Sequence, residues 1–337
     1  MPVIVFHPRT ALLTALLLLS ECATGTRAGA AGHAACPVSA RAQPAVVRLR
    51  ETMAHGRFVS YEPTSLRVVD GRVTDADPAS IRADLGRLRE RFDALITYDA
   101  IHGAQQIPAI AAELKFRALI IGVWDPTDRG QVDAALDAAR RFPELIAGIS
   151  LGNELQFTHR TEPARLIALI EGVRARAPAV PLSTTEPFHI YDDPAAAKVL
   201  GHLDFLLLNV HPIFQPWFRD APLSTAAQFV VNVVAKLAAV ACGPVLVKET
   251  GVPSAPESAG FGEARQAEFY RELRRLLPPG TTQAFAYFAA FDEPWRAYDA
   301  TGVPGTPAVH PEEAHWGLYD EARRPKAAAR ELPPLTR

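Results

Sequence analysis

Apolar and polar positions recur along this chain in a pattern that predicts a sheet of parallel strands covered by helices. Short apolar runs of strand length are separated by longer stretches in which apolar and charged residues recur at helical spacing. Strands buried on both faces, as in parallel sheets, are apolar throughout. The runs that we assign to strands are residues 57–61, 94–98, 117–124, 146–151, 180–184, 205–209, 244–249 and 283–290.

Residues that favour helix starts stand between these runs. Asp77 and Asp193 each precede a proline, and Thr161 begins a similar Thr-Glu-Pro segment, so each pairs a cap with a proline at the first helical position. Ser224 is expected to cap an apolar helix that extends to residue 241, and residues 263–277 form another helical pattern. Eight strand and helix units predict an α/β fold, a single-domain (β/α)8 TIM barrel. A doubly wound sheet is the competing architecture, but no glycine-rich phosphate loop follows the first strand.

The N-terminal residues have a different character. The apolar run from Ala11 to Leu19 is too short to span a bilayer and predicts a signal peptide within residues 1–30. Cleavage before Cys22, with lipidation of that cysteine as a membrane anchor, and cleavage after Ala30 both remain open. We therefore expect an exported bacterial protein, either periplasmic, secreted or an outer-surface lipoprotein. Residues 31–50 are interpreted as a disordered tether, and residues 51–337 as the barrel domain.

The composition of the chain limits the kinds of partner and cofactor that we expect. A formal net charge of -2 gives no reason to expect a polyanion, so nucleic acid is not a predicted partner. Cys36 and Cys242 form either a disulfide, which export permits, or two buried thiols. Neither HExxH nor paired CxxC spacing occurs, and we expect no cofactor and no catalytic metal. We expect the protein to be a monomer.

Polar and aromatic residues gather where the predicted strands end, which is the face that carries the active site in barrel enzymes. Glu154 follows the fourth strand and Glu249 ends the seventh, so the two can approach the separation of roughly 5 to 5.5 Å that retaining glycoside hydrolysis requires. Strand alternation predicts that Lys248 points away from Glu249. The residues expected to bind substrate are Tyr61, Tyr98, Trp124, Asn153, Glu186, Asn209, His211, Trp217, Asp292, Glu293 and Trp295. For Glu186 and Glu293, orienting neighbouring groups is an equal alternative.

Five segments in order resemble glycoside hydrolase family 17, the β-1,3-glucanase-like enzymes of a retaining clan. Residues 249–254, ETGVPS, are similar to the family's ETGWPS, and residues 152–154, GNE, to its acid/base element. TTEPF at residues 184–188, FDEPW at 291–295 and HWGL at 315–318 resemble further family segments, so the resemblance spans about residues 57–319.

The resemblance implies a role for each matched residue. Glu154 would be the general acid/base, Glu249 the nucleophile, and Asn153 a ligand of the sugar 2-hydroxyl, while Glu293 and Trp295 would line subsites. It also implies a β-glucan substrate, oligosaccharide or polysaccharide, with β-1,3 linkages expected. Three positions depart from the family pattern, namely Val252 for tryptophan, His211 for tyrosine and Arg296 for lysine. They bear on substrate identity more than on reaction type.

Three alternatives share parts of this pattern. A β-glucan transglycosylase would use the same two glutamates. A serine hydrolase would use Ser150, because residues 148–152 read GISLG and match the GxSxG nucleophile elbow, with Asp292 and either His310 or His315 as partners. That elbow requires a helix directly after the serine, whereas residues 153–160 intervene here before the helix predicted at Thr161. A sugar-binding barrel without turnover is the third alternative.

Overall fold

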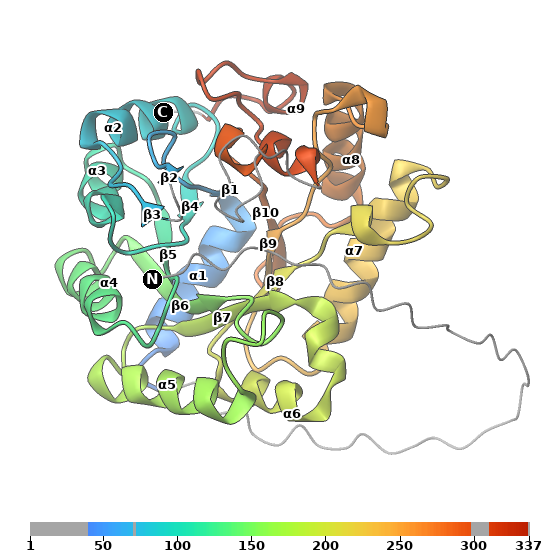
Figure 1. Cartoon of the computed structure of the whole chain (residues 1–337). Coiled ribbons are helices and arrows are strands. Elements are labelled where there is room, and N and C mark those ends of the chain that lie inside the picture. Colours follow the sequence, from blue (N-terminus) through green and yellow to red (C-terminus); the bar gives the residue numbers. More distant parts are fainter. Residues whose placement is uncertain (1–39, 70–71, 298–309, 336–337) are drawn as a thin grey trace, which may run out of the picture.

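The computed structural model describes residues 40–69, 72–297 and 310–335. Eight parallel strands close into a barrel in the order β1-β10-β9-β8-β7-β6-β5-β4, and β1 completes the ring by pairing with both β4 and β10. Figure 1 shows the helices arranged around this barrel. The predicted (β/α)8 fold is confirmed. The predicted signal peptide and the cysteines Cys22 and Cys36 lie outside the described residues, so lipidation and the Cys36–Cys242 pairing stay predictions.

Each of the eight predicted strand segments overlaps one barrel strand. The barrel strands are β1 (Phe58–Ser60), β4 (Ala94–Ile96), β5 (Ala118–Val123), β6 (Ile146–Asn153), β7 (Leu182–Pro187), β8 (Leu206–Asn209), β9 (Val245–Glu249) and β10 (Gln283–Tyr287). A separate antiparallel pair consists of β2 (Val68–Val69) and β3 (Arg72–Val73).

The helices are α1 (Gln43–His55), α2 (Pro78–Leu88), α3 (Ile107–Glu113), α4 (Arg129–Arg141), α5 (Pro163–Arg176), α6 (Pro194–Ala197), α7 (Leu223–Ala238), α8 (Glu263–Leu276) and α9 (Ala327–Arg330). The short 3-10 helices are η1 (Ala104–Gln106), η2 (Phe188–Asp192), η3 (Lys198–His202), η4 (Pro212–Phe214), η5 (Glu257–Ala259), η6 (Pro294–Ala297) and η7 (Pro311–His315). In the part of the chain that the structure describes, no helix combines the length and the apolar content needed to cross a bilayer.

Two apolar layers hold the barrel together, because successive side chains of a strand point to opposite faces. The larger layer lies between the strands and the surrounding helices. The smaller one fills the barrel interior, where Phe205, Leu207 and Leu246 are buried. Gly148 makes room for Phe205, since an added Cβ would lie 2.6 Å from that ring.

Helix α1 covers the amino-terminal end of the barrel. Its Leu49 and Met53 are buried in the barrel interior, and Arg50 Nη1 donates to the carbonyl of Thr281, just before β10, at 3.0 Å. Figure 1 shows α1 against β6 and β10. The prediction of a tether over residues 31–50 is therefore wrong for residues 43–50. The apolar residues of this segment are mostly alanine and valine and stand among arginines. The segment therefore has the composition of a linker, although it forms a helix.

Two of the four predicted caps are present and two are wrong. The Asp77 carboxylate accepts from the N–H of Ser80 at 2.7 Å at the start of α2, and Asp193 does the same for Ala195 at 2.8 Å in α6. Thr161 does not cap α5, because Glu162 is the residue before that helix and no side chain caps it. Ser224 does not cap α7, because Pro222 is already the residue before the helix and Ser224 lies within its first turn. A proline with φ of -62° leads directly into helical backbone.

Candidate active site

Two glutamates meet at the carboxyl end of the barrel. Glu154 directly follows β6 and Glu249 ends β9, the fourth and seventh barrel strands, and each is 7% exposed. Asn209, at the end of β8, links them: its Nδ2 donates to Glu154 Oε1 at 2.9 Å, and it pairs in register with Glu249. The charge of Glu249 also acts on the Glu154 carboxyl. The barrel therefore brings together the two carboxyls that the sequence singled out.

The backbone at Glu154 has an uncommon conformation. Its φ of 56° lies in the left-handed region, which costs a non-glycine residue about 1 kcal/mol or more. The N–H of Glu154 donates to the Thr185 carbonyl at 2.7 Å, and its own carbonyl accepts from the N–H of Thr158 at 3.0 Å. Gly152 precedes it with φ of 89°, and an added Cβ there would lie 2.2 Å from the Leu155 side chain. These contacts turn the chain sharply after β6 and direct the carboxyl across the end of the barrel.

Glu186 holds the loop that follows Glu154. Its carboxyl is fully buried at the end of β7 and accepts from the N–H groups of Gln156 at 2.9 Å and Phe157 at 3.2 Å. Burial raises the pKa of Glu186 to about 7, although these two hydrogen bonds oppose the rise. The contacts favour an orienting role for Glu186 over direct binding of sugar hydroxyls.

The pKa values of the two glutamates are displaced in opposite directions. Burial and the charge of Glu249 raise the pKa of Glu154, and the hydrogen bond from Asn209 offsets part of the rise. Burial would also raise the pKa of Glu249, but Lys248 and His211 outweigh it and lower that pKa to about 2. Glu154 is therefore the better proton donor, and Glu249 stays ionised near neutral pH.

Lys248 contradicts the sequence prediction. Its Nζ lies 3.5 Å from Glu249 Oε1 and donates to Asn153 Oδ1 at 2.7 Å, rather than pointing away. Alternation gives Lys248 the inward direction of Leu246, and its long side chain then extends up the barrel interior to the carboxyl end, where Glu249 also turns inward. The sequence did contain a signal for this position: Lys248 is two residues after Leu246 on the same strand, so both side chains point into the barrel.

Tyr98, which follows β4, and His211, which follows the neighbouring strand β8, lie beside the Lys248 and Glu249 side chains of β9. The Tyr98 ring packs against the Lys248 ammonium, with Nζ 3.7 Å from the ring centroid. His211 Nε2 lies 3.4 Å from Glu249 Oε2, and its ring packs 5.1 Å from that of Trp316. Within the described residues, His211 Nδ1 and Asn209 Oδ1 are buried and have no hydrogen-bond partner. Unpaired buried polar atoms are costly, so these two atoms are suited to meet hydroxyl groups of a substrate.

A second group of charges lies beside Tyr98. Arg296 donates to Glu293 and, at 3.0 Å, to Glu62, and its guanidinium stacks 4.8 Å from the ring centre of Trp295. The charges of Glu62, Glu293 and Arg296 all act on the Tyr98 hydroxyl, which places them on the same side of the barrel end. Glu293 thus lies on the side of the barrel end that holds Tyr98 and Glu249, and Arg296 contacts both Glu293 and Trp295.

Exposed aromatic rings stand at the strand ends. Trp124 follows β5, Phe157 follows β6 and Phe214 follows β8, with exposed fractions of 42%, 38% and 55%. The Arg160 guanidinium lies 4.9 Å from the centre of the Trp124 ring. Exposed aromatic faces are suited to stack on sugar rings. The predicted role of Trp124 is consistent with this position.

Three predicted substrate ligands have other partners. Tyr61 is fully buried, and its hydroxyl donates to Asp84 at 2.9 Å, so it does not face the site. Asp292 Oδ1 accepts from Lys326 Nζ at 2.5 Å and from the N–H of Gly317 at 3.0 Å, so it joins two C-terminal segments. Trp217 packs on Phe229 of α7, with ring centres 5.5 Å apart, and lines an open groove of about 510 Å³ between α7 and α8. A strand-end position does not by itself turn a side chain toward Glu154 and Glu249, because neighbouring segments supply competing partners.

Ser150 has no nucleophile geometry. It lies inside β6, is 1% exposed, and its hydroxyl is 3.0 Å from that of Thr185. No helix directly follows it, since β6 continues to Asn153 and α5 begins at Pro163. The serine hydrolase alternative is therefore wrong.

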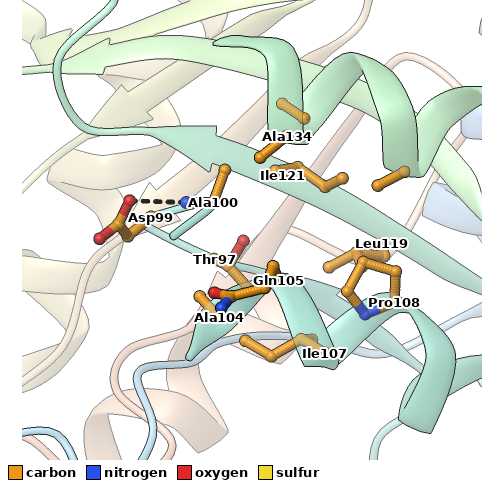
Figure 2. Close-up of a pocket in the computed structure, with 12 residues that line it drawn as sticks. Thr97, Asp99, Ala100, Ala104, Gln105, Ile107, Pro108, Leu119, Ile121 and Ala134 are labelled. Carbon is orange, nitrogen blue, oxygen red and sulfur yellow. Dashed lines mark hydrogen bonds between the residues drawn. The ribbon is translucent and has the colours of Figure 1, made fainter. Parts of the chain in front are cut away.

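Figure 2 shows a separate small cavity between β4, β5, α3 and α4. It holds about 10 Å³, and its lining includes Thr97, Ile107 and Leu119. Asp99 lies at its edge and accepts from the N–H of Ala100 at 2.7 Å. This volume admits at most about one water molecule, so the cavity is a packing defect rather than a substrate site. Over residues 40–69, 72–297 and 310–335, no cluster of three or more His, Cys, Asp or Glu is placed to hold a metal ion.

A (β/α)8 barrel with a proton-donating and an ionised glutamate at the ends of its fourth and seventh strands has the arrangement of a retaining glycoside hydrolase. The chain belongs to the BtgE/BtgC glycoside hydrolase domain family, whose model matches residues 59–317. The resemblance predicted from the sequence motifs is confirmed.

The individual proteins that resemble this chain share 15% to 27% of its residues in the aligned regions. A glucan 1,3-beta-glucosidase from Arthroderma benhamiae is 27% identical over 257 residues, which cover 72% of this chain and 82% of that protein. The solved glycoside hydrolase family 17 beta-1,3-glucanosyltransferase from Rhizomucor miehei is 21% identical, with a TM-score of 0.58 over 81% of this chain and 96% of that chain. A beta-glucuronidase from an uncultured Clostridium has a TM-score of 0.60 at 15% identity, and the match covers 82% of this chain and 49% of that chain. The two structures share the barrel fold.

Proposed function

We propose that this protein cleaves β-glucan, with β-1,3 linkages as the expected substrate, by double displacement through a glycosyl-enzyme. The observation that carries the proposal is the meeting of two buried carboxyls at the ends of β6 and β9, with Asn209 bonded to Glu154 and Lys248 beside Glu249. The raised pKa of Glu154 and the lowered pKa of Glu249 agree with it. The choice of β-1,3-glucan is supported by the family match and by the glucan 1,3-beta-glucosidase relative.

In the first step, a lone pair of the Glu249 carboxylate forms a bond to the anomeric carbon. The bond from that carbon to the leaving oxygen breaks, and the leaving oxygen takes the proton of Glu154. The raised pKa of Glu154 provides this proton, and the lowered pKa of Glu249 keeps the nucleophile ionised.

In the second step, Glu154, now a carboxylate, removes a proton from an incoming hydroxyl group. The oxygen of that group bonds to the anomeric carbon, and Glu249 leaves as a carboxylate. When the hydroxyl group belongs to water the product is a shorter sugar, and when it belongs to another glucan the product is a longer one. The exposed rings of Trp124 and Phe157, which follow β5 and β6, support binding of a sugar at the acceptor side.

The test is a product-size analysis with defined β-1,3-glucan oligosaccharides, and Glu249→Gln serves as the inactive control. Shorter products alone indicate hydrolysis, and products longer than the substrate indicate transfer. If the unmodified protein binds the oligosaccharide but leaves it unchanged, the proposal for β-1,3-glucan is refuted. That result would favour a sugar-binding barrel without turnover.

The two roles are assigned by chemical rescue. We expect Glu249→Ala to lose nearly all activity and to recover part of it with azide, giving a glycosyl azide of inverted configuration. Glu154→Ala with azide should give the retained product. The reverse pattern of configurations would exchange the two roles.

We further propose that the protein is exported and acts as a monomer. Export is supported by the apolar run from Ala11 to Leu19, and a monomer by the fact that one chain supplies both glutamates. We favour cleavage after Ala30 over lipidation of Cys22. Intact mass of the mature protein separates these two outcomes, and light scattering in solution measures the oligomeric state.

A further inference from the structure

Lys248 is a fully buried cation below the catalytic pair. It is 1% exposed and lies on β9 with its side chain inside the barrel. Removing an ammonium group from water costs several kcal/mol, so such a group is retained where strong contacts offset the cost. The contacts of Lys248 therefore indicate what it does.

All of its close partners belong to the site. Nζ donates to Asn153 Oδ1 at 2.7 Å, lies 3.5 Å from Glu249 Oε1, and lies 3.7 Å from the centre of the Tyr98 ring. These partners come from β6, from β9 and from the residues after β4. One ammonium group thus joins the residue before the acid/base, the nucleophile and an aromatic wall.

The contact with Asn153 fixes which way its amide points. An ammonium group only donates hydrogen bonds, so the carboxamide must present its oxygen to Nζ. Its Nδ2 is then on the opposite side, and within the described residues it donates to no other group. Asn153 is also partly exposed at the barrel end. An amide that could otherwise rotate by half a turn is held with its donor free for a ligand.

The contact of Lys248 with Glu249 favours the ionised form of that carboxyl. The groups that face this carboxyl or its lysine partner are Lys248, His211, Tyr98, Glu154 and Glu62. Burial raises the pKa of Glu249, and Lys248 provides the largest opposing effect. Without the lysine, burial and the neighbouring carboxyl of Glu154 would both favour the protonated nucleophile.

We propose that Lys248 is a positioning residue that holds the Asn153 amide with Nδ2 toward the 2-hydroxyl of the reacting sugar and keeps Glu249 ionised. The inference rests on the proposed function. It assigns to Lys248 no contact with the substrate, because the lysine is buried and its Nζ lies against Asn153, Glu249 and the Tyr98 ring.

The experiment compares two aryl glycosides of a β-1,3-linked disaccharide, one with and one without the 2-hydroxyl on the reacting ring. Lys248→Met keeps the length of the side chain and removes its charge and donors. At a pH on the activity plateau, we expect it to lower kcat/KM about 10- to 100-fold for the 2-hydroxyl substrate, because the Asn153 oxygen loses its partner. For the 2-deoxy substrate we expect a loss of no more than about threefold, since the contact is already absent.

The pH profile provides a second readout. In Lys248→Met, the acidic limb of kcat/KM should move up by about one pH unit or more, because the opposing cation is gone. Lys326→Met is the matched control: Lys326 is also buried, at 7% exposed, but its Nζ contacts Ser254 and Asp292. It should lower kcat/KM by the same factor for both substrates and leave the acidic limb in place.

Equal losses for the two substrates in Lys248→Met, or an unmoved acidic limb, would overturn the inference while the proposed function stands. Failure of the unmodified protein to cleave the 2-hydroxyl substrate, with Glu249→Gln equally inactive, would overturn the proposed function and this inference with it. Asn153→Ala should reproduce the substrate pattern without the shift in pH, which separates the two effects of the lysine.

Discussion

The buried carboxyl of Glu186 allows a test of which effect dominates at the end of β7, burial or hydrogen bonding. It accepts from two backbone N–H groups, yet its pKa is raised from 4.5 to about 7. Because the folded-state pKa lies above the unfolded value, the folded protein binds more protons between these pH values. The contribution of Glu186 to stability is therefore fully present below about pH 4.5 and is lost as the pH rises through about 7.

The magnitude follows from the two pKa values. The difference between 4.5 and about 7, at about 1.4 kcal/mol for each pH unit, amounts to about 3 kcal/mol. The Glu186→Gln variant has nearly the shape of the protonated carboxyl and never ionises. One of the two accepting oxygens becomes an NH2 group that cannot accept, and this loss is the same at every pH. We therefore expect the stability of the variant relative to the unmodified protein to rise by about 2 to 3 kcal/mol between pH 5 and pH 8.

The assay is urea unfolding at several pH values from 5 to 8, with fluorescence and circular dichroism compared to check for a single transition. All other titrating groups are shared, so the difference between the two proteins isolates Glu186. Glu162→Gln is the matched control, because Glu162 is an exposed carboxyl before α5 whose side chain makes no capping hydrogen bond. It should change stability by less than about 0.5 kcal/mol at every pH.

A Glu186→Gln variant whose stability relative to the unmodified protein does not rise between pH 5 and pH 8 would refute this reasoning. It would mean that the two charge-assisted hydrogen bonds from Gln156 and Phe157 outweigh the cost of burying the ionised carboxyl. A constant difference between pH 5 and pH 8 would show that the carboxyl does not titrate in this range.

Three further substitutions test the framework of the site. Met53→Ala should lower the free energy of unfolding by about 2 to 5 kcal/mol, measured in urea, because Met53 fills the covered end of the barrel. Asp84→Ala should lower the free energy of unfolding by about 3 kcal/mol or more, because Arg323 Nε, which lies 2.7 Å from Asp84, loses its partner. An unchanged melting temperature would contradict this. Gly152→Ala should lower kcat more than it raises KM, because a Cβ at φ of 89° would collide with Leu155 and displace the turn into the acid/base; wild-type kinetics would disprove that role for the turn.

The barrel was predictable because its signal is local. Each strand is a short apolar run, and the runs recur with helical patterns between them, so eight segments define the ring without knowledge of any contact. The carboxyl ends of parallel strands share one face. For that reason Glu154, Glu249 and Asn209 were predictable as neighbours from topology alone.

The errors arose where distant segments compete for a side chain. Tyr61 and Asp292 follow strands like true ligands of a barrel site, but Asp84 and Lys326 bind them, and neither partner is signalled by spacing. For Lys248, alternation gives the face of a strand and says nothing about how far a long side chain reaches along the barrel axis.

The covering helix α1 has a consequence for folding. It is synthesised before every strand of the barrel, yet the carbonyl that Arg50 binds belongs to Thr281, 231 residues later. Pairing across such a separation carries a large loop-closure cost and slows folding. We therefore expect Leu49 and Met53 to be fully buried only when β10 closes the ring, so that α1, which precedes all the barrel strands in the chain, is among the last of the described helices to be buried.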